Sequence, residues 1–415
     1  MTLALALMIV FLAAWYVVVV FTRPTWVGDE YHHVPAIRGI VTGDWTSARG
    51  LPMAPTYHVL VALLARVLGT ELWALRLVNP LLGIATLVFM YTAIRARCPA
   101  AGAHTLLRFA LNPLLLPLWV FVYTDVAALL GVVAALNFYV RGRHLSAAAA
   151  LFVACLVRQS NVVWALLFAG LAVLDLWRAD GRPAAGWRTA WRNLRLHSAA
   201  RVVWPYALAF VLGVVWLVLC ARATLTYKLE NRPQANIAQF YVLFLTAALL
   251  WAPLWLAHLA RVWSRSFTAA LERPWTCAAV IAAVGALELL FDNPHPWNLD
   301  RHYLRNWPLY AMTYSLAARY LLALCIVAFV VTYVHATWRS PARGTLAVVW
   351  IFSLLFLLPH FLVDPRYYIV PLVLLDFFTP YTPAQARHLS IWYLLLTLLV
   401  GVWIVVQPGD WSGVW

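Results

Sequence analysis

The chain has 415 residues, of which 64% are hydrophobic and only 11% are charged, and its mean hydropathy is +0.80. Soluble domains are about half apolar and about a quarter charged, so this composition argues against a soluble globule, a disordered chain, collagen or a coiled coil. The net charge of +15 would suggest a nucleic-acid ligand in a soluble protein. Basic residues also collect in the cytoplasmic loops of membrane proteins. We therefore expect a multi-pass membrane protein that contacts lipid and binds no nucleic acid.

Apolar stretches that could form membrane helices recur along the whole chain. A helix needs about 20 apolar residues to cross the hydrocarbon core. The predicted spans are 3–21, 71–94, 105–119, 124–140, 145–157, 161–177, 202–221, 237–260, 275–291, 310–334, 345–363, 366–379 and 389–407. Because the patterns at 105–119, 145–157 and 366–379 are weak, we expect about 11–13 helices, with the short segment 56–68 lying along the interface. The expected fold is all-α, with one membrane domain over residues 1–415.

Arginine clusters between these spans predict the orientation of the chain. The clusters contain Arg95, Arg97, Arg108, Arg141, Arg143, Arg178, Arg182, Arg188, Arg192, Arg195, Arg201, Arg261, Arg265, Arg273, Arg339 and Arg343. Placing them in the cytoplasm puts the segments 22–70, 222–236, 292–309 and 364–366, and the breaks near 120–125 and 158–161, at the outer face. Most acidic residues then avoid the bilayer centre, where an ionised Asp costs roughly 2.5–3.5 kcal/mol. We therefore expect the polar residues that could carry out a reaction to lie at the outer face of the membrane.

The first candidate motif follows the first predicted helix. It runs from Gly28 through Asp29 and Glu30 to His33, and an acidic residue recurs at Asp44. An outward-facing carboxylate can accept a proton from an incoming hydroxyl. The alternative is a solvated loop that merely caps the next short helix.

Two further motifs interrupt apolar runs near the outer face. Tyr123-Thr124-Asp125 could be part of a site or an ordinary helix N-cap. Arg158 opens the run Arg158-Gln159-Ser160-Asn161 and belongs to no cytoplasmic cluster. An arginine at this depth should pair either with a phosphate or with an acid such as Asp125.

The outer segment with the most charged, histidine and aromatic residues is 292–303, and the last polar motif along the chain is 364–368. Arg301 offers a bidentate fork for a phosphate, and His302 can add a hydrogen-bond donor. His295, Asp300 and His302 could provide metal ligands, but their spacing matches no recognised metal-site pattern. Arg366 lies where arginine is otherwise scarce, and its alternative reading is an interfacial side chain that reaches toward water.

Read in order, these motifs resemble the family of dolichyl-phosphate-glucose-dependent α-1,2-glucosyltransferases, which add the last glucose to the lipid-linked N-glycan precursor. The matching stretches are Asp29-Glu30-Tyr31-His32-His33-Val34-Pro35, Gly43-Asp44-Trp45, Leu75-Arg76-Leu77-Val78-Asn79, Tyr123-Thr124-Asp125, Arg158-Gln159-Ser160-Asn161, Asn298-Leu299-Asp300-Arg301-His302-Tyr303 and Pro365-Arg366-Tyr367-Tyr368. The resemblance implies a GT-C fold with a first outer loop of short helices. It also implies a polyprenyl-phosphate sugar donor, a lipid-linked glycan acceptor, and an active site on the lumenal or periplasmic side of the endoplasmic reticulum or bacterial inner membrane.

The resemblance also implies roles for individual residues of the site. Asp29 is the expected general base and Glu30 its alternate, while the donor phosphate is expected on Arg301, His302, Arg366 and Arg158. Substrate-orienting roles fall to His33, Asp44, Asp125, Asp300 and Tyr303. No cofactor or metal is indicated, because no recognised metal-ligand spacing appears. A polyprenyl phosphate leaves as a stable anion, so a general acid is dispensable. Direct attack on the anomeric carbon predicts inversion.

One stretch departs from the family, and three other functions remain open. The family's Thr-Thr-Pro-Gly-Leu-Tyr is replaced here by the segment 51–57, so the identity of the sugar and the acceptor stays open. The rivals are a lipid or glycan transporter, a related enzyme that modifies lipid A or proteins, and a non-catalytic membrane subunit. Transporters usually place ionisable groups near the bilayer midplane, which this chain avoids.

Overall fold

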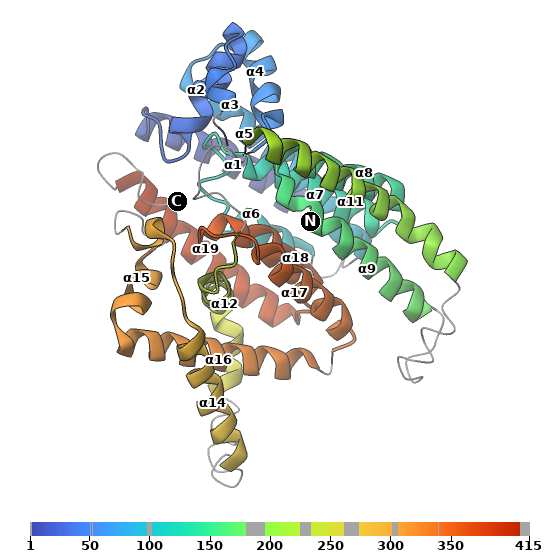
Figure 1. Ribbon diagram of the computed structural model, residues 1–415, viewed down its shortest axis with the longest axis vertical. Coiled ribbons are helices and arrows are strands. Elements are labelled where there is room, and N and C mark those ends of the chain that lie inside the picture. The colour runs from blue at the N-terminus through green and yellow to red at the C-terminus, as the bar shows by residue number, and fades with distance from the viewer. Residues whose placement is uncertain are drawn as a thin grey trace.

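The computed structural model describes residues 2–49, 51, 53–97, 102–179, 196–224, 234–260, 274–300, 306–338 and 340–406. All secondary structure in these residues is helical, which confirms the predicted all-α fold class (Figure 1). The longer helices are α1 (Thr2–Thr22), α5 (Leu72–Arg97), α7 (Asp125–Tyr139), α8 (His144–Val157), α9 (Val162–Ala179), α11 (Leu196–Thr224), α12 (Ala238–Leu250), α14 (Pro274–Leu290), α16 (Leu316–Trp338), α17 (Arg343–Leu357) and α19 (Pro383–Val406). The shorter elements are α2 (Glu30–Thr42), α3 (Thr46–Arg49), α4 (Thr56–Leu68), α6 (Gly102–Ala110), η1 (Gln159–Asn161), η3 (Pro296–Leu299), α15 (Trp307–Tyr314), η5 (Pro365–Tyr368) and α18 (Ile369–Phe378).

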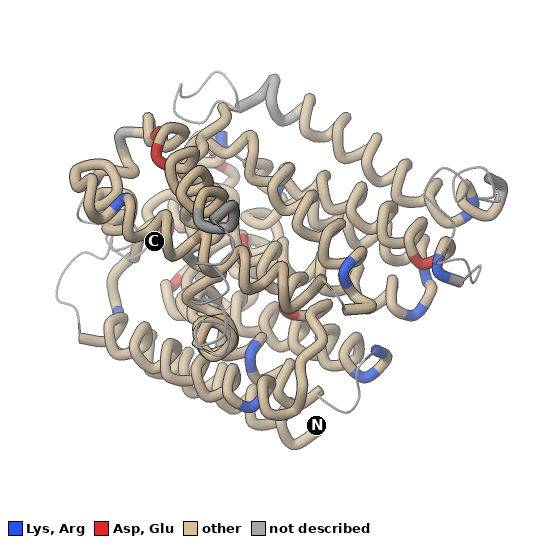
Figure 2. The backbone as a smooth tube through the Cα atoms, turned by 90° about the horizontal axis from the view of Figure 1, so that it is seen from below, with Lys and Arg blue, Asp and Glu red and all other residues tan. Residues whose placement is uncertain are grey.

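Many of these helices are built to lie in a membrane. Within the described residues, six are long and apolar enough to cross a bilayer, and a seventh span is formed if the bent pair 238–250 and 252–260 crosses as one. Five shorter apolar helices of 10–17 residues accompany them. In Figure 2 long stretches of the backbone carry no charged residue, and the chain is thus an integral, multi-pass membrane protein.

Three predicted spans have a different shape in the structure. The predicted helix 105–119 ends at Ala110, because Pro113 disfavours a helical conformation at Asn112, whose side chain instead accepts a hydrogen bond from the Leu114 amide at 3.0 Å. The span 237–260 bends by 78°. The span 310–334 is divided at Ser315, where an extended residue separates α15 from α16 and the Ser315 hydroxyl accepts from the Ala318 amide.

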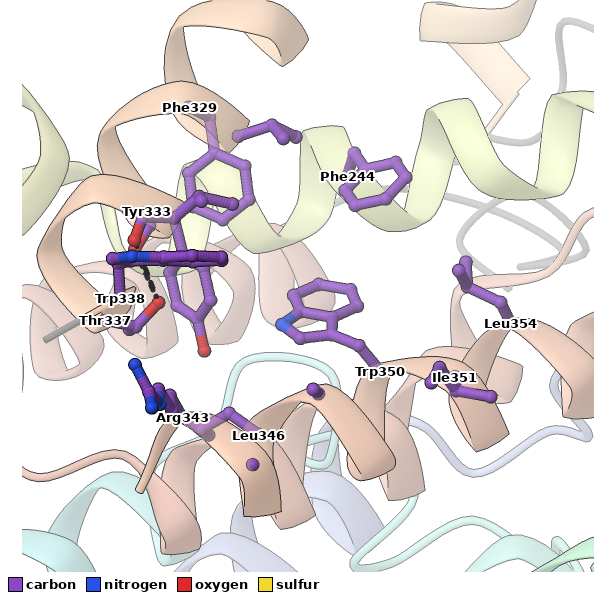
Figure 3. A pocket seen from close by; sticks show the side chains of 14 residues that line it. Phe244, Phe329, Tyr333, Thr337, Trp338, Arg343, Leu346, Trp350, Ile351 and Leu354 are labelled. Carbon is purple, nitrogen blue, oxygen red and sulfur yellow. Dashed lines mark hydrogen bonds between the residues drawn. The ribbon is translucent and has the colours of Figure 1, made fainter. Parts of the chain in front are cut away.

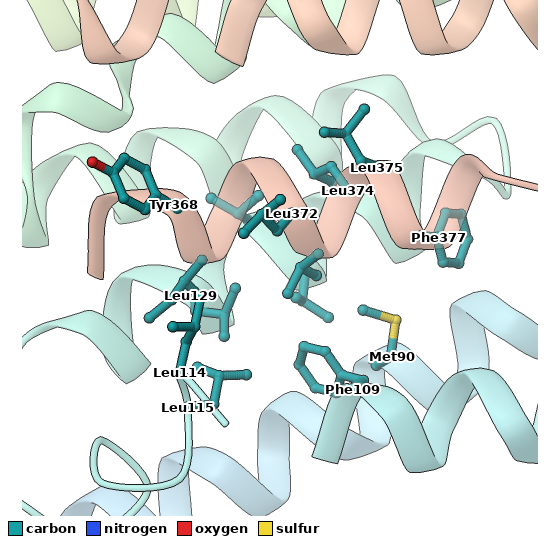
Figure 4. Packing of buried hydrophobic residues seen from close by; sticks show 14 of the residues in the cluster. Met90, Phe109, Leu114, Leu115, Leu129, Tyr368, Leu372, Leu374, Leu375 and Phe377 are labelled. Carbon is teal, nitrogen blue, oxygen red and sulfur yellow. The ribbon is translucent and has the colours of Figure 1, made fainter. Parts of the chain in front are cut away.

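The core is formed by helices that are apolar on nearly every side. Figure 1 shows α7, α8, α9 and α11 running side by side. At Gly131 of α7 an added Cβ would lie 2.8 Å from the Ala154 Cβ of α8, so the absence of a side chain lets the two helices approach closely. Figure 4 shows α18 presenting Leu372 and Phe377 to Phe109 and Met90 of α6 and α5. A helix that is hydrophobic all round is expected to be buried, and α18 is.

Helices α2, α3 and α4 form a separate lobe at one end of the molecule (Figure 1). They have their own apolar cluster, which includes Val34, Ile37 and Val61 and reaches Val122 and Val157. The 13-residue helix α4 fits the prediction that segment 56–68 is too short to cross a bilayer. The lobe follows α1 directly and begins with the loop that carries Asp29, so its packing fixes the first candidate motif against the membrane helices.

Candidate functional site

The loop between α1 and α2 is fixed by one buried ion pair. Arg76 of α5 donates from Nε to Glu30 Oε1 at 2.9 Å and from Nη2 to Oε2 at 2.5 Å, and both side chains are fully buried. Glu30 also accepts from the backbone amides of Val27 and Val122, each at 2.9 Å. Four donors therefore occupy both carboxylate oxygens of Glu30, which leaves them no free position for a substrate.

Asp29, the neighbour of Glu30, points into a different environment. Gly28 takes a left-handed conformation with φ of 53°, and the Asp29 amide donates to the Tyr123 hydroxyl at 2.9 Å. Arg366 of η5 donates from Nη1 to Asp29 Oδ2 at 2.5 Å. The Asp29 side chain remains 37% exposed, and the described residues place no hydrogen bond on Oδ1. Asp29 thus has a carboxylate oxygen available to a ligand, whereas Glu30 has none.

Arg366 is held by a second carboxylate that no solvent reaches. Asp364 accepts from Nε of Arg366 at 2.9 Å, from Nη2 at 2.5 Å and from the Arg366 amide at 3.0 Å. The Arg366 guanidinium also lies over the Tyr123 ring, 5.1 Å from its centroid. One face of the guanidinium fork is therefore fixed on Asp364, and Nη1 alone reaches Asp29.

A second guanidinium lies beside the first. Arg158 forms an ion pair with Asp125 and lies over the Tyr367 ring at 5.6 Å. Asp125, Arg158, Arg366 and Tyr367 line one small cavity, so the two ion pairs are neighbours. The other carboxylate oxygen of Asp125, Oδ2, is buried and has no hydrogen-bond partner among the described residues. Such an oxygen is costly to leave unsatisfied, which marks it as a point where a ligand donor could bind.

The loop that precedes Arg366 is held by polar side chains from two other segments. Gln239 of α12 donates to the His360 carbonyl at 3.0 Å and accepts from the Tyr368 hydroxyl at 2.8 Å. Asn298 of η3 accepts from the Val363 amide at 3.1 Å. His360 lies 4.4 Å from the Tyr367 ring. These bonds hold Asp364 and Arg366 in place.

The charges of the cluster control how its members titrate. Burial by itself would raise the pKa of Asp29, but Arg366, and then His33, hold that pKa below its usual value. Burial, and after it the nearby Arg158, lower the pKa of His360 to about 4. At neutral pH Asp29 is therefore ionised and His360 is neutral.

Two buried histidines lie behind Asp29. Nδ1 of His33 and Nε2 of His58 are 2.8 Å apart, and His33 packs edge-on against Tyr123. Burial lowers the pKa of His33 to about 4, although Asp29 opposes the shift. The buried His33 is therefore neutral at pH 7 and adds no charge beside the Asp29 carboxylate.

We expect acidification from pH 6.5 to pH 4 to destabilise the protein through His33. The unfolded chain takes up this proton near the ordinary pKa of about 6.5, while the folded chain resists it until about pH 4. The contribution is therefore fully present above pH 6.5 and is lost as the pH falls, by up to about 3 kcal/mol. Thermal unfolding of wild type and His33→Gln at pH 7 and pH 4.5 measures it. The variant should lose less stability on acidification, and equal losses in both proteins would contradict the assignment.

The structure brings together five of the predicted site residues and leaves others apart. Asp29, His33, Asp125, Arg158 and Arg366 converge in the cluster. Asp44 is exposed and accepts instead from the Thr46 amide at 2.9 Å. The Asp300 carbonyl accepts a hydrogen bond from the Asn306 side chain at 3.0 Å. The predicted residues Arg301, His302 and Tyr303 lie outside the described residues.

Several residues of the cluster had no predicted role. Three of them belong to motifs named above, namely Asp364, Tyr123 and Tyr367. For Asp364, the local signal was its position two residues before Arg366, with which it forms an ion pair. His58 and His360 carry no such local signal. Within the described ranges, no group of three or more His, Cys, Asp or Glu side chains is placed to hold a metal ion.

Comparison with known proteins matches one family model and three chains of solved structures. A model of the DIE2/ALG10 family matches residues 23–377. No curated protein sequence gives a significant match. ArnT from Cupriavidus metallidurans matches in its apo state with 15% identity and a TM-score of 0.41, covering 97% of this chain and 77% of that chain. Its structure bound to undecaprenyl phosphate matches with 16% identity and a TM-score of 0.43, covering 96% and 77%.

Proposed function

The chain belongs to the DIE2/ALG10 family and is thus a membrane glycosyltransferase that uses lipid-linked substrates, and from this premise we propose its reaction. It moves a hexose, glucose by the family resemblance, from a polyprenyl-phosphate donor to a hydroxyl of a lipid-linked glycan at the outer face of the membrane. The observation that carries this proposal is the contact between Asp29 and Arg366, which joins a proton acceptor to an anion-binding group.

The reaction needs only one carboxylate. The acceptor hydroxyl attacks the anomeric carbon, the bond from that carbon to the phosphate oxygen breaks, and the phosphate leaves with the electron pair. The hydroxyl proton passes to Asp29. Glycosidases usually add an acid that protonates the leaving oxygen, but a phosphate anion leaves without one. Attack opposite the leaving group inverts the anomeric centre.

The charge balance of the cluster supports a further requirement for donor binding. Among the residues that the structure describes, the carboxylates of Asp29, Asp125 and Asp364 face the guanidinium groups of Arg158 and Arg366, which leaves an excess of one negative charge within this set. A phosphate would therefore need another cation. Arg301 and His302 follow Asn298 in the sequence, and Asn298 contacts the loop that carries Asp364. We assign to Arg301 and His302 the role of binding the donor phosphate.

Donor binding and base activation are coupled in this arrangement. Arg366 keeps Asp364 on Nε and Nη2 while only Nη1 contacts Asp29. A donor phosphate that takes over Nη1 would release Oδ2 of Asp29 and raise the basicity of that carboxylate, because an ion pair stabilises the ionised form. The base would then become effective when the donor is present.

A transfer assay with the purified protein in liposomes tests the proposal. With polyprenyl-phosphate [¹⁴C]glucose and a lipid-linked glycan, we expect the label to appear on the glycan in a new glycosidic bond of inverted configuration. Asp29→Asn is the negative control. Movement of labelled lipid across the bilayer with no new glycosidic bond would contradict the proposal and favour the transporter.

A further inference from the structure

A large cavity lies between α12, α16 and α17, away from the cluster around Asp29. Its volume is about 710 Å³, and its lining is mostly apolar and aromatic. Figure 3 shows Phe244, Phe329 and Trp350 around it, with Leu354 at one end and Arg343 at the other. Such a lining offers water few hydrogen-bond partners, and an empty cavity would leave these side chains without packing contacts.

The two ends of the cavity differ in polarity. Arg343, the first residue of α17, is exposed, and among the described residues no carboxylate pairs with it. Trp338, the last residue of α16, is 65% exposed beside it, and Thr337 lies on the same turn (Figure 3). Arg178 of α9 reaches the same place and donates to the Thr345 hydroxyl at 2.8 Å. Guanidinium groups and tryptophan gather where helices meet the lipid headgroups.

The length of the cavity matches one leaflet of a bilayer. The 12 residues from Arg343 to Leu354 rise about 16 Å along α17. This is about half of the hydrocarbon thickness of roughly 30 Å. The polar end also lies opposite the Asp29 cluster, because α17 runs from Arg343 to Leu357 and the chain then enters the loop that carries Asp364 and Arg366.

We propose that this cavity is a binding site for an anionic glycerophospholipid of the leaflet opposite the reaction centre. The lipid phosphate contacts Arg343, with Trp338 at the glycerol level, and one acyl chain fills the space between α12, α16 and α17. An anionic headgroup is favoured over a zwitterionic one because Arg343 has no acidic partner in the described chain, and the positive end of the α17 dipole adds to its charge. The site is separate from the donor site, since its polar end lies at the other end of α17.

Lipid retention by the purified full-length protein tests the proposal. The protein is equilibrated with equal amounts of phosphatidylglycerol and phosphatidylethanolamine in detergent, and bound lipid is measured by native mass spectrometry. We expect wild type to retain phosphatidylglycerol in preference, and Arg343→Glu to lower that retention about fivefold, as loss of a contact worth about 1 kcal/mol implies. Arg143→Glu, at an exposed position in the turn before α8, is the matched control and should retain the wild-type amount.

A second variant tests the acyl chain independently of charge. Ala347→Trp places an indole in the cavity and should reduce retention of both lipids, while the unfolding temperature stays near that of wild type. Equal retention of the two lipids by wild type would overturn the proposal, as would retention that neither Arg343→Glu nor Ala347→Trp changes. Because the readout is bound lipid rather than transfer, a failure here would leave the proposed reaction unaffected.

Discussion

Replacing Asp29 with Asn should lower the rate of sugar transfer by about 10²–10⁴-fold while the protein stays folded. An amide of the same shape can still accept from Nη1 of Arg366, but it cannot take the proton of the acceptor hydroxyl. The side chain is 37% exposed, so the change leaves no fully buried group unpaired. Single-turnover transfer with saturating donor measures the rate, and a melting curve measures the fold.

Asp44→Asn is the matched control for this experiment. Asp44 is an acidic residue of the same lobe, but it is exposed and bonded to Thr46 rather than to the cluster. We expect it to transfer sugar at a rate near that of wild type. If Asp29→Asn retained near-normal turnover, or if Asp44→Asn lost as much activity, the assignment of the base would fail.

Replacing Arg76 with Met should cost about 3–5 kcal/mol of stability, the range seen when one partner of a buried ion pair is removed. Glu30 would lose its two guanidinium donors inside the protein, and the carbonyls of Arg23 and Thr25 would lose theirs. The loop that carries Asp29 should loosen as a result. Chemical or thermal unfolding in detergent measures the loss.

The double variant Glu30→Gln/Arg76→Met provides the control for the Arg76 experiment. It removes both charges at once, so it should recover much of the stability that Arg76→Met loses. Unfolding of Arg76→Met at the wild-type temperature would contradict a structural role for the pair. A double variant that is less stable than either single one would contradict the explanation by an unpaired buried charge.

The sequence was enough to predict the fold class, and it singled out several polar residues that the structure brings close together. Hydropathy identifies membrane helices because the surfaces that face lipid or the protein core must be apolar. It placed the helical regions at 3–21 and 202–221. It could not distinguish a helix from a buried turn at 105–119, since Asn112 and Pro113 decide that locally while the average over the segment stays apolar. The pairing of Arg158 with Asp125 was predicted as an alternative to phosphate binding, and the structure shows that ion pair.

Other features of the site depend on contacts between distant parts of the chain. Asp29 and Glu30 are adjacent and look equivalent in sequence, yet Arg76 binds one and Arg366, 337 positions away, binds the other. Neither partner can be chosen from local spacing. The role of Asp364 likewise depends on three bonds to Arg366 in the folded chain.

The central claim is that the base and the anion-binding groups share one reaction centre at the outer face. Single cysteines at Tyr31 and Arg301, with Arg343 as the reference for the opposite face, can be labelled with an impermeant maleimide in sealed vesicles of a variant that lacks the native cysteines. The account predicts that the cysteines at 31 and 301 react from the outside and the one at 343 only after the vesicles are opened. Labelling of positions 31 and 301 from opposite sides of the bilayer would contradict it.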